Sequence, residues 1–396
     1  MRFDASFLVP FVIFIAVFST IWGLAHYYLY KRFVSSIGTM SKGAIFVIEL
    51  VFFLLGLSFP LTYILIRITR TPFVLSVYHI SSIWMGVLFY LLLFSVAVHM
   101  VELILKRVEL WDRLETDYGF DIPRTGMFVA IVLAVVVSAV ALHGASRAPK
   151  VARLDVPVSR LPARLDGFKI VQLADLHLGA NVGREKLERI VEITNLLEPD
   201  LVVITGDLIE SEGLYMPTLL RPLMQIKSRY GVFAVMGNHE YYTFEGADKV
   251  VEIISKFGVK FLQNEVVRIA GGISLFGITD PDARIVGGKS LSTDELVERV
   301  VAKGNKSDVK LLLAHRPSGF RKAAELGVDL MLASHTHGGQ LWPIGFLMKL
   351  FYPYTHGHYR LADSHLYVSC GAGTWGPPMR LGAPPEIAFI TLKKAR

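Results

Sequence analysis

The sequence predicts a membrane region of four helices followed by an α/β domain, and three observations support this fold class. Hydrophobic residues make up 53% of the 396 residues and charged residues only 19%, an unusual balance for a soluble protein. Long apolar stretches are confined to residues 1–145. From about residue 169 onward, short β-branched apolar runs alternate with amphipathic helical patterns.

Four apolar stretches in residues 1–145 are each near or above the length that crosses a bilayer. They cover residues 7–30, 44–66, 73–100 and 127–143. The first has no small-residue cleavage pattern after it, so we expect a retained anchor rather than a cleaved signal peptide. Four spans would place both chain ends on one side, but the flanking lysines and arginines are nearly equal in number on the two sides. We expect a multi-pass protein of a bacterial inner membrane, with the face that carries the second domain left open.

A change of composition marks the boundary between the two regions. Residues 146–168 contain Arg, Pro and Asp and are expected to form a linker, and the second domain is expected to cover residues 169–396. Its apolar β-branched runs end at Ala174, Thr205, Val235, Ile278, Leu313, Leu332, Ser369 and Leu392. Helical patterns lie between several runs, for example Arg184–Leu197 and Asp294–Ala302. This order indicates an α/β or mixed sandwich.

Charge and cysteine content limit the classes of partner. The formal net charge is +7, but the lysines and arginines are scattered and form no run that could follow a phosphate backbone. We therefore expect the bilayer, and no nucleic acid, as a partner. Cys370 is the only cysteine, so no disulfide can form within the chain.

Residues of the types that bind metal ions directly follow five of the predicted strands. They are Asp175, His177, Asp207, Asn238, His315, His335 and His337. A single Asp or His at a strand end is usually a cap or a satisfied polar group, but five such strand ends together indicate a shared site. Carboxylates, imidazoles and an amide oxygen suit manganese, iron or zinc better than calcium. Two such ions about 3.5–4 Å apart can clamp the oxygens of a phosphoryl group during its transfer.

With these residues in this order, the second domain resembles the calcineurin-like metallophosphoesterase superfamily. The matching segments are Asp175-Leu176-His177, Gly206-Asp207, Gly237-Asn238-His239-Glu240, His315 and His335-Thr336-His337. The Gly338-Gly339-Gln340 tail and Pro384-Pro385-Glu386-Ile387 are similar to the membrane-linked branch of YkuE-like and YaeI-like phosphodiesterases and transmembrane metallophosphoesterase proteins. The resemblance implies a four-layer fold in which helices flank two packed mixed sheets and metals lie at the strand ends. Ser334 departs from the family pattern, which usually has glycine before the His-x-His unit.

The resemblance also implies a role for each site residue. One divalent metal would be held by Asp175, His177, Asp207 and His337, and the other by Asp207, Asn238, His315 and His335. Asp207 would thus bridge the two metals. His239 would face the substrate and protonate the leaving oxygen or steady the transferring phosphate, with Glu210 as the carboxylate that orients it.

The implied reaction is hydrolysis of a phosphodiester or pyrophosphate by a water or hydroxide that bridges the two metals. No nucleophile-elbow sequence is present, in agreement with a solvent-derived nucleophile. Membrane tethering favours a phosphorylated, lipid-linked substrate such as UDP-2,3-diacylglucosamine of lipid A biosynthesis, with a nucleotide or phospholipid phosphodiester as the alternative. A non-catalytic membrane receptor or scaffold would be expected to lack a metal ligand or the acid. A carbon–nitrogen hydrolase would lack the Gly-Asn-His-Glu unit.

Two further features lie close to the predicted site. Residues 340–354 are rich in Leu, Phe, Trp and Tyr, which is unusual for an exposed loop. They could form a lid that packs on its own domain, or an apolar wall that receives lipid chains or enters the bilayer interface. Arg380 is a candidate contact to the substrate phosphate because a guanidinium matches phosphate oxygens in a fork, with a surface salt bridge as the alternative.

Overall fold

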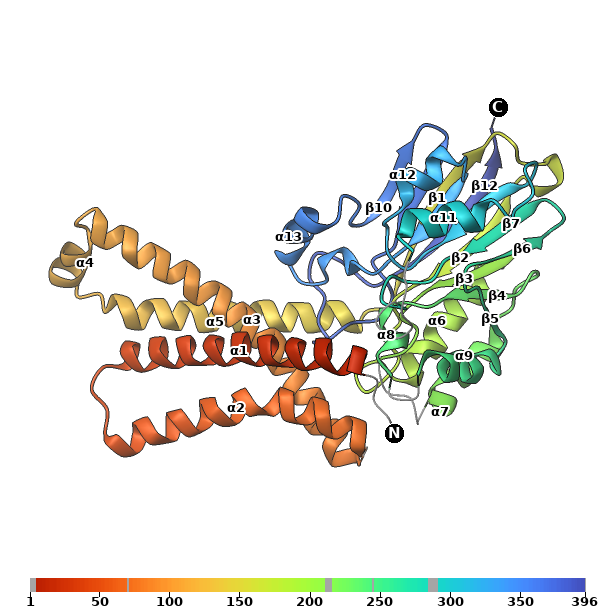
Figure 1. Cartoon of the computed structure of the whole chain (residues 1–396). Helices are drawn as coiled ribbons and strands as arrows, with labels where there is room; N and C mark the ends of the chain where they lie inside the picture. The colour runs from red at the N-terminus through yellow and green to blue at the C-terminus, as the bar shows by residue number, and fades with distance from the viewer. Residues whose placement is uncertain (1–4, 70, 211–215, 244–245, 284–290, 396) are drawn as a thin grey trace. The chain divides into compact units, whose positions relative to one another are not determined.

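The computed structural model describes residues 5–69, 71–210, 216–243, 246–283 and 291–395. The chain divides into two compact units. The first comprises Met1–His143 with Gly376–Met379, and the second comprises Gly144–Trp375 with Arg380–Arg396. The first unit is helical and the second is built around β-strands (Figure 1).

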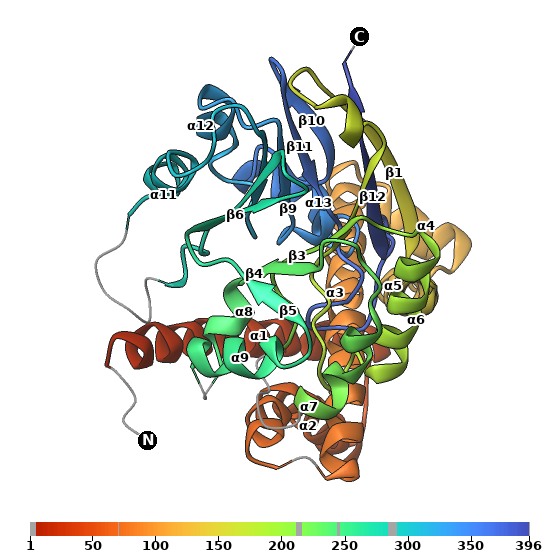
Figure 2. The ribbon, with the colours of Figure 1, turned by 90° about the vertical axis from the view of Figure 1, so that its right-hand side faces the viewer.

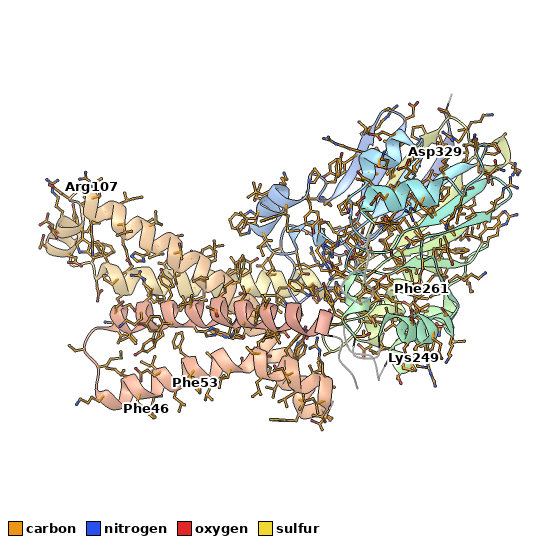
Figure 3. All side chains as sticks on the ribbon, viewed as in Figure 1. Phe46, Phe53, Arg107, Lys249, Phe261 and Asp329 are labelled. Carbon is orange, nitrogen blue, oxygen red and sulfur yellow. The ribbon has the colours of Figure 1, made fainter. Side chains whose placement is uncertain are left out.

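Long apolar helices form the first unit. They are α1 (Ala5–Ile37), α2 (Lys42–Ile68), α3 (Pro72–Arg107) and most of α5 (Ile122–Ser146), with the short α4 (Trp111–Tyr118) between the last two. The side chains of Ser41 and Thr71 accept backbone N–H groups and cap the first turns of α2 and α3. Apolar side chains of α2 point outward, and Phe46 and Phe53 are 63% and 61% exposed (Figure 3). Apolar side chains exposed in this way are suited to contact with the hydrocarbon core of a bilayer.

Three helices, rather than the four predicted, are long and apolar enough to cross a membrane in the part of the chain that the structure describes. They are α2, α3 and α5, with mean hydropathies of 2.4, 2.3 and 2.6. The expected span at residues 7–30 lies in α1, whose described part carries His26, Lys31 and Arg32. Trp84 donates a hydrogen bond to His26, so this face of α1 serves helix packing rather than lipid contact. The described residues therefore support three candidate spans rather than the four predicted, and the side on which each chain end lies stays a prediction.

Two six-stranded mixed sheets form the centre of the second unit. The first has the order β1 (Lys150–Val158), β12 (Glu386–Lys394), β2 (Phe168–Leu173), β3 (Leu201–Thr205), β4 (Val232–Val235) and β5 (Val259–Phe261). The second has the order β10 (Gly357–Leu361), β11 (Ser364–Val368), β9 (Leu330–Ala333), β8 (Val309–Leu313), β7 (Ile273–Gly277) and β6 (Glu265–Ile269). Because β2, β3 and β4 are parallel, as are β8 and β9, their carboxyl ends meet at one edge of each sheet.

Helices cover the outer face of each sheet, which produces four layers (Figure 2). Helices α6 (Arg184–Leu196) and α9 (Ala247–Ser255) pack on the first sheet, and α11 (Thr293–Val301) and α12 (Phe320–Glu325) pack on the second. Apolar side chains from both sheets, including Val203 of β3 and Leu311 of β8, fill the space between them. The shorter elements are η1 (Ala163–Leu165), α7 (Met216–Leu220), η3 (Arg221–Gln225), α8 (Asn238–Tyr241), η4 (His337–Gly339) and α13 (Ile344–Phe351). The prediction of a two-sheet α/β domain is confirmed.

The expected linker at residues 146–168 contains a strand. Strand β1 pairs in parallel with β12 along its whole length, from Lys150 opposite Glu386 to Val158 opposite Lys394. Because β1 is an edge strand, much of it stays exposed and it can include Pro157, so its composition is like that of a linker. The first sheet therefore begins before the predicted domain boundary at residue 169.

Candidate metal centre

The carboxyl ends of β2, β3, β4, β8 and β9 bring all seven predicted metal ligands together at one end of the paired sheets. Asp175 and His177 follow β2, Asp207 follows β3, Asn238 follows β4, His315 follows β8, and His335 and His337 follow β9. Six of the seven are buried, and His335 is partly exposed. The parallel register of the strands thus gathers side chains that lie far apart in the sequence.

Five of these residues hold their backbone in the left-handed region, which side chains other than glycine rarely adopt. Asp175, His177, Asp207, His335 and His337 have φ between 46° and 73°. Each such conformation costs roughly 1–3 kcal/mol and persists only where surrounding contacts impose it. Here the backbone N–H of His177 donates to the carbonyl of Asp207 at 2.9 Å, which ties the loop after β2 to the loop after β3. A concentration of strained backbone is characteristic of functional sites.

Asp207 lies between two groups of donor atoms. Its Oδ2 is 3.6 Å from His177 Nε2 on one side and 3.3 Å from His315 Nε2 on the other. His315 Nε2 is also 3.0 Å from Asn238 Oδ1 and 3.1 Å from His335 Nδ1. This placement suits the bridging position that the resemblance implies for Asp207.

The remaining two predicted ligands adjoin these groups. His337 Nε2 lies 3.1 Å from His177 Nε2. The carboxylate of Asp175 accepts the backbone N–H of His335 at 3.2 Å and approaches His315 Nδ1 to 3.8 Å. Buried carboxylates and imidazole nitrogens at such distances are unfavourable unless protons or cations lie among them. The donor set therefore fits borderline divalent cations.

Each of the four histidines directs one ring nitrogen toward the centre and the other toward an outer partner. The outer partners are Glu210 for His177 at 2.8 Å, the Thr205 carbonyl for His315 at 2.9 Å, the Tyr352 hydroxyl for His335 at 2.9 Å, and Arg380 for His337 at 3.3 Å. Histidines that ligate metals are usually oriented in this way by a second polar group. The arrangement is the strongest indication that these residues hold metal ions.

Two groups of three residues at the site could each hold a metal ion, because the ligand atoms within each group lie within 4.8 Å of one another. Asp207, His315 and His335 form one group, which matches the predicted second metal. The other group joins His177 with Glu210 and His239, two residues that were predicted to lie outside both metal shells. A further group, His356, Cys370 and Glu386, includes none of the predicted ligands.

Burial and neighbouring charges shift the pKa values of the ligands in different directions. Burial raises the pKa of Asp175 to about 6, whereas His315 overcomes burial to hold the pKa of Asp207 well below its usual range. Burial, followed by the charge of His315, lowers the pKa of His335 to about 2, and burial also lowers that of His337. His335 and His337 are thus neutral, which is the form that binds metals. Burial opposes protonation of His315, but Asp207 raises its pKa to about 10, so His315 must release a proton when a cation binds.

His239 and Glu210 form a pair beside the predicted ligands. The backbone N–H of His239 donates to Asp207 Oδ1 at 3.0 Å, and its Nδ1 lies 3.1 Å from Glu210 Oε1. Burial disfavours the charged ring, but Glu210 and Asp207 together raise the pKa of His239 to about 9. His239 is therefore protonated near neutral pH, as an acid catalyst requires. Glu210 contacts His177 through its other oxygen, so one carboxylate positions both rings.

Arg380 has a different environment from the one expected of a substrate contact. Its side chain is only 2% exposed, and its guanidinium donates to the carbonyls of Gly373, Ala383 and Cys370. These contacts place Arg380 behind His337 rather than on an open surface. The structure therefore favours a positioning role over the predicted phosphate contact.

Three contributions to the site were not foreseen from the sequence. The carboxylate of Glu240 accepts the backbone N–H groups of Asp207, Ile209 and Gly237 at 2.7–3.1 Å and so joins the loops after β3 and β4. Tyr352 and Thr205 orient ligand histidines from outside the site. Glu240 was visible as the last residue of the Gly-Asn-His-Glu segment, whereas a tyrosine in an aromatic segment and a backbone carbonyl carry no distinguishing sequence signal.

Comparison of the chain with known proteins finds a matching family model and several similar proteins. Residues 168–339 match the family model described as calcineurin-like phosphoesterase. An uncharacterised metallophosphoesterase of Campylobacter jejuni is 33% identical, with 97% of this chain and 99% of the relative covered. The transmembrane protein with metallophosphoesterase domain of Bos taurus is 37% identical, with 67% of this chain and 62% of the relative covered. The match to YkuE of Bacillus subtilis has 30% identity and covers 59% of this chain and 82% of the relative. Against the relatives from cattle and Danio rerio, the chain spans less than two thirds of their length, at 62% and 64%.

Proposed function

Because the chain belongs to the calcineurin-like metallophosphoesterase family, we propose that it is a membrane-anchored hydrolase of phosphodiesters or pyrophosphates with two divalent metals. The observation that carries this proposal is the set of four histidines that each direct one nitrogen toward Asp207 and its neighbours and the other toward an outer partner. Manganese, iron and zinc all suit this donor set. The three apolar helices supply the membrane association.

Asp207 would serve both metals. The first would be held by Asp175, His177, Asp207 and His337, and the second by Asp207, Asn238, His315 and His335. When bound, two such ions stabilise charge on the phosphoryl oxygens and acidify the attacking water. The protein contributes a preformed set of ligands whose backbone is already fixed in the required conformation.

His239 would supply the proton for the leaving oxygen. Glu210 lies 3.1 Å from its ring as an ion-pair partner, and its backbone N–H donates to Asp207, so the proton donor would lie next to the bridging carboxylate. Loss of a proton from His239 leaves a neutral ring next to Glu210, and that carboxylate favours recovery of the proton from solvent.

Trp375 would form a wall beside the leaving group. Its indole ring is 52% exposed, and its centroid lies 6.5 Å from that of His239. Gln340 holds the backbone of Trp375 with two hydrogen bonds, of 2.8 Å and 2.9 Å. An exposed aromatic face in a fixed position suits contact with an apolar or planar part of the substrate.

Membrane tethering favours a substrate that is itself in the bilayer. A lipid-linked pyrophosphate such as UDP-2,3-diacylglucosamine is the first candidate, and a role in lipid A biosynthesis would follow from it. Turnover of this compound can be compared with that of UDP-N-acetylglucosamine, which has a similar head but no long acyl chains. Equal kcat/KM values for the two would point instead to nucleotide substrates.

The general activity is tested with the purified full chain in detergent, stripped with EDTA and then supplied with Mn²⁺. Release of p-nitrophenolate from bis(p-nitrophenyl) phosphate is measured for the wild type, Asp207→Asn and a control, Asp363→Asn, whose side chain is 92% exposed. We expect the control to retain turnover and Asp207→Asn to lose at least ~100-fold, because a ligand shared by both metals is removed. Equal turnover by wild type and Asp207→Asn would overturn the two-metal proposal.

A further inference from the structure

The segment after His337, a proposed metal ligand, presents an apolar surface on helix α13 and on Trp342 just before the helix. This surface, the α13 face, consists of Trp342, Phe346, Leu347, Leu350 and Phe351, which are 48%, 63%, 56%, 78% and 77% exposed. No residue of α13 is buried. Helix α13 itself therefore does not pack as a lid on its own domain. Contiguous exposed apolar side chains usually mark a contact surface.

The α13 face is held outward by a rigid attachment at each end of the helix. At the first end, Gly339 has φ of +83° and approaches Gly345 so closely that an added Cβ would lie 2.3 Å from the Gly345 Cα. At the other end, the hydroxyl of Tyr352 lies 2.9 Å from Nε2 of His335. One end of the helix is therefore packed on Gly339, two residues after His337, and the other end contacts His335.

The chemistry of the face and the covalent arrangement of the chain both indicate a bilayer as its partner. Only Arg147, Ala148 and Pro149 separate the end of α5 at Ser146 from the start of β1. The second unit is thus tethered directly to a helix that is long and apolar enough to span a membrane. The face combines a tryptophan and phenylalanines with the exposed Lys349, whose ammonium lies 5.8 Å from the Phe346 ring. Tryptophan and lysine at the edge of an apolar face are typical of helices that lie in the membrane interface.

We propose that the α13 face inserts into the boundary between head groups and acyl chains of the bilayer that holds the chain's own membrane helices. Leu350 and Phe351 enter the acyl region, while Lys349 reaches the phosphate groups. Because both ends of α13 are attached to the His335–His337 segment, this contact places the metal centre beside the membrane surface. The proposal concerns membrane contact and does not depend on catalysis.

The test uses the full chain in vesicles of phosphatidylcholine and phosphatidylglycerol. A Leu350→Cys variant is labelled with the environment-sensitive dye NBD, and lipids with a nitroxide near the top or near the end of the acyl chain serve as quenchers. Leu196→Cys on α6 is the matched control, since Leu196 is 81% exposed but lies outside the α13 face. Cys370 is 1% exposed and resists labelling, and the unsubstituted chain measures its background.

We expect blue-shifted emission at position 350 and stronger quenching by the shallow nitroxide, with neither effect at position 196. A blue shift without lipid quenching would mean that protein, such as a second copy of the chain, covers the face, and would overturn the proposal. Quenching at position 350 no stronger than at 196 would also overturn it.

A second arm tests whether the apolar side chains themselves drive insertion. NBD is placed at Phe346→Cys in a chain that also carries Leu350→Asp and Phe351→Asp. Both aspartates replace highly exposed side chains, so folding is preserved, but carboxylates are costly to place in the acyl region. Quenching at position 346 is expected to fall to the level of position 196. Undiminished quenching would show that these side chains do not hold the helix in the bilayer.

Discussion

At the scale of single residues, the candidate metal ligands stand at strand ends, and groups from elsewhere in the fold orient their rings. Asp175, Asp207 and His315 stand directly after apolar strands, so chain order alone places them at a sheet edge. The outer partners of His315 and His335 are the backbone carbonyl of Thr205 and the hydroxyl of Tyr352, which reach the site only through tertiary packing. The same holds for Arg380, which was expected to contact a substrate phosphate or form a surface salt bridge and instead donates to three backbone carbonyls beside His337.

Replacement of Glu210 by Gln is expected to move the alkaline limb of the pH–kcat profile to lower pH. His239 donates a proton only while it is protonated, so activity falls as pH rises through its pKa, which is about 9 without metals. The Glu210 carboxylate raises this pKa, and its removal takes that contribution away. The profile is measured for wild type, Glu210→Gln and Asp363→Asn; an unmoved limb in Glu210→Gln would exclude His239 as the acid that Glu210 supports.

Removal of the Tyr352 hydroxyl by Tyr352→Phe is expected to weaken Mn²⁺ binding about 10-fold, because outer partners of ligand histidines contribute by this order. The hydroxyl lies 2.9 Å from Nε2 of His335, whereas the nearby Tyr354 contacts the ring of Phe320 instead. Tyr354→Phe is therefore the matched control and should bind Mn²⁺ as the wild type does. Equal affinities for both variants, measured by metal titration, would show that Tyr352 does not orient His335.

At the scale of elements, the interior strands were predicted closely and the edge strands poorly. The predicted ends at Thr205, Val235 and Leu313 coincide with the ends of β3, β4 and β8. These strands are buried on both faces and have continuous apolar runs. Strand β1 was missed because an edge strand exposes much of its surface and carries polar residues and Pro157. Sequence patterns report burial, so an edge strand with few buried positions leaves little signal.

The turn after β3 is expected to tolerate no side chain at Gly206. This residue has φ of +91°, and an added Cβ would lie 2.5 Å from His315 Nδ1. We expect Gly206→Ala to destabilise the metal-free protein by about 2–5 kcal/mol, from left-handed strain and overpacking together. Gly258 has a similar φ of +88° with nothing within 4 Å of an added Cβ, so Gly258→Ala should cost only about 1–2 kcal/mol.

Thermal unfolding followed by intrinsic fluorescence gives Tm for the two variants and the wild type. Gly206→Ala should have the lower Tm of the two. Equal Tm values would mean that a Cβ at position 206 is accommodated beside His315 without extra strain.

At the scale of the whole molecule, composition identified a membrane region but overestimated its spans. Hydropathy over residues 7–30 is high, yet α1 carries charged and hydrogen-bonded residues in its described part, and only α2, α3 and α5 qualify as candidate spans. The α/β order of the second unit was recognisable because its strands and helices alternate in the sequence.

Removal of metal is expected to lower the Tm of the whole protein. Without cations, the protonated His315 is the positive charge beside the buried carboxylates of Asp207 and Asp175. A bound cation takes over this role, and His315 gives up its proton. At a Mn²⁺ concentration of 100 times Kd, stabilisation is about 2.7 kcal/mol. Tm is measured after EDTA treatment and again after Mn²⁺ is restored, with Asp207→Asn as the reference. A Tm shift in Asp207→Asn as large as in the wild type would mean that Mn²⁺ stabilises another part of the chain.

The most direct test of a two-metal centre bridged by Asp207 is electron paramagnetic resonance of the Mn²⁺-loaded full chain, with metal content measured on the same sample. Two ions about 3.5–4 Å apart that share a carboxylate should be exchange-coupled. We therefore expect two manganese ions per chain and a coupled multiline spectrum, which Asp207→Asn loses. One manganese ion per chain with the six-line spectrum of an isolated ion would contradict the two-metal centre.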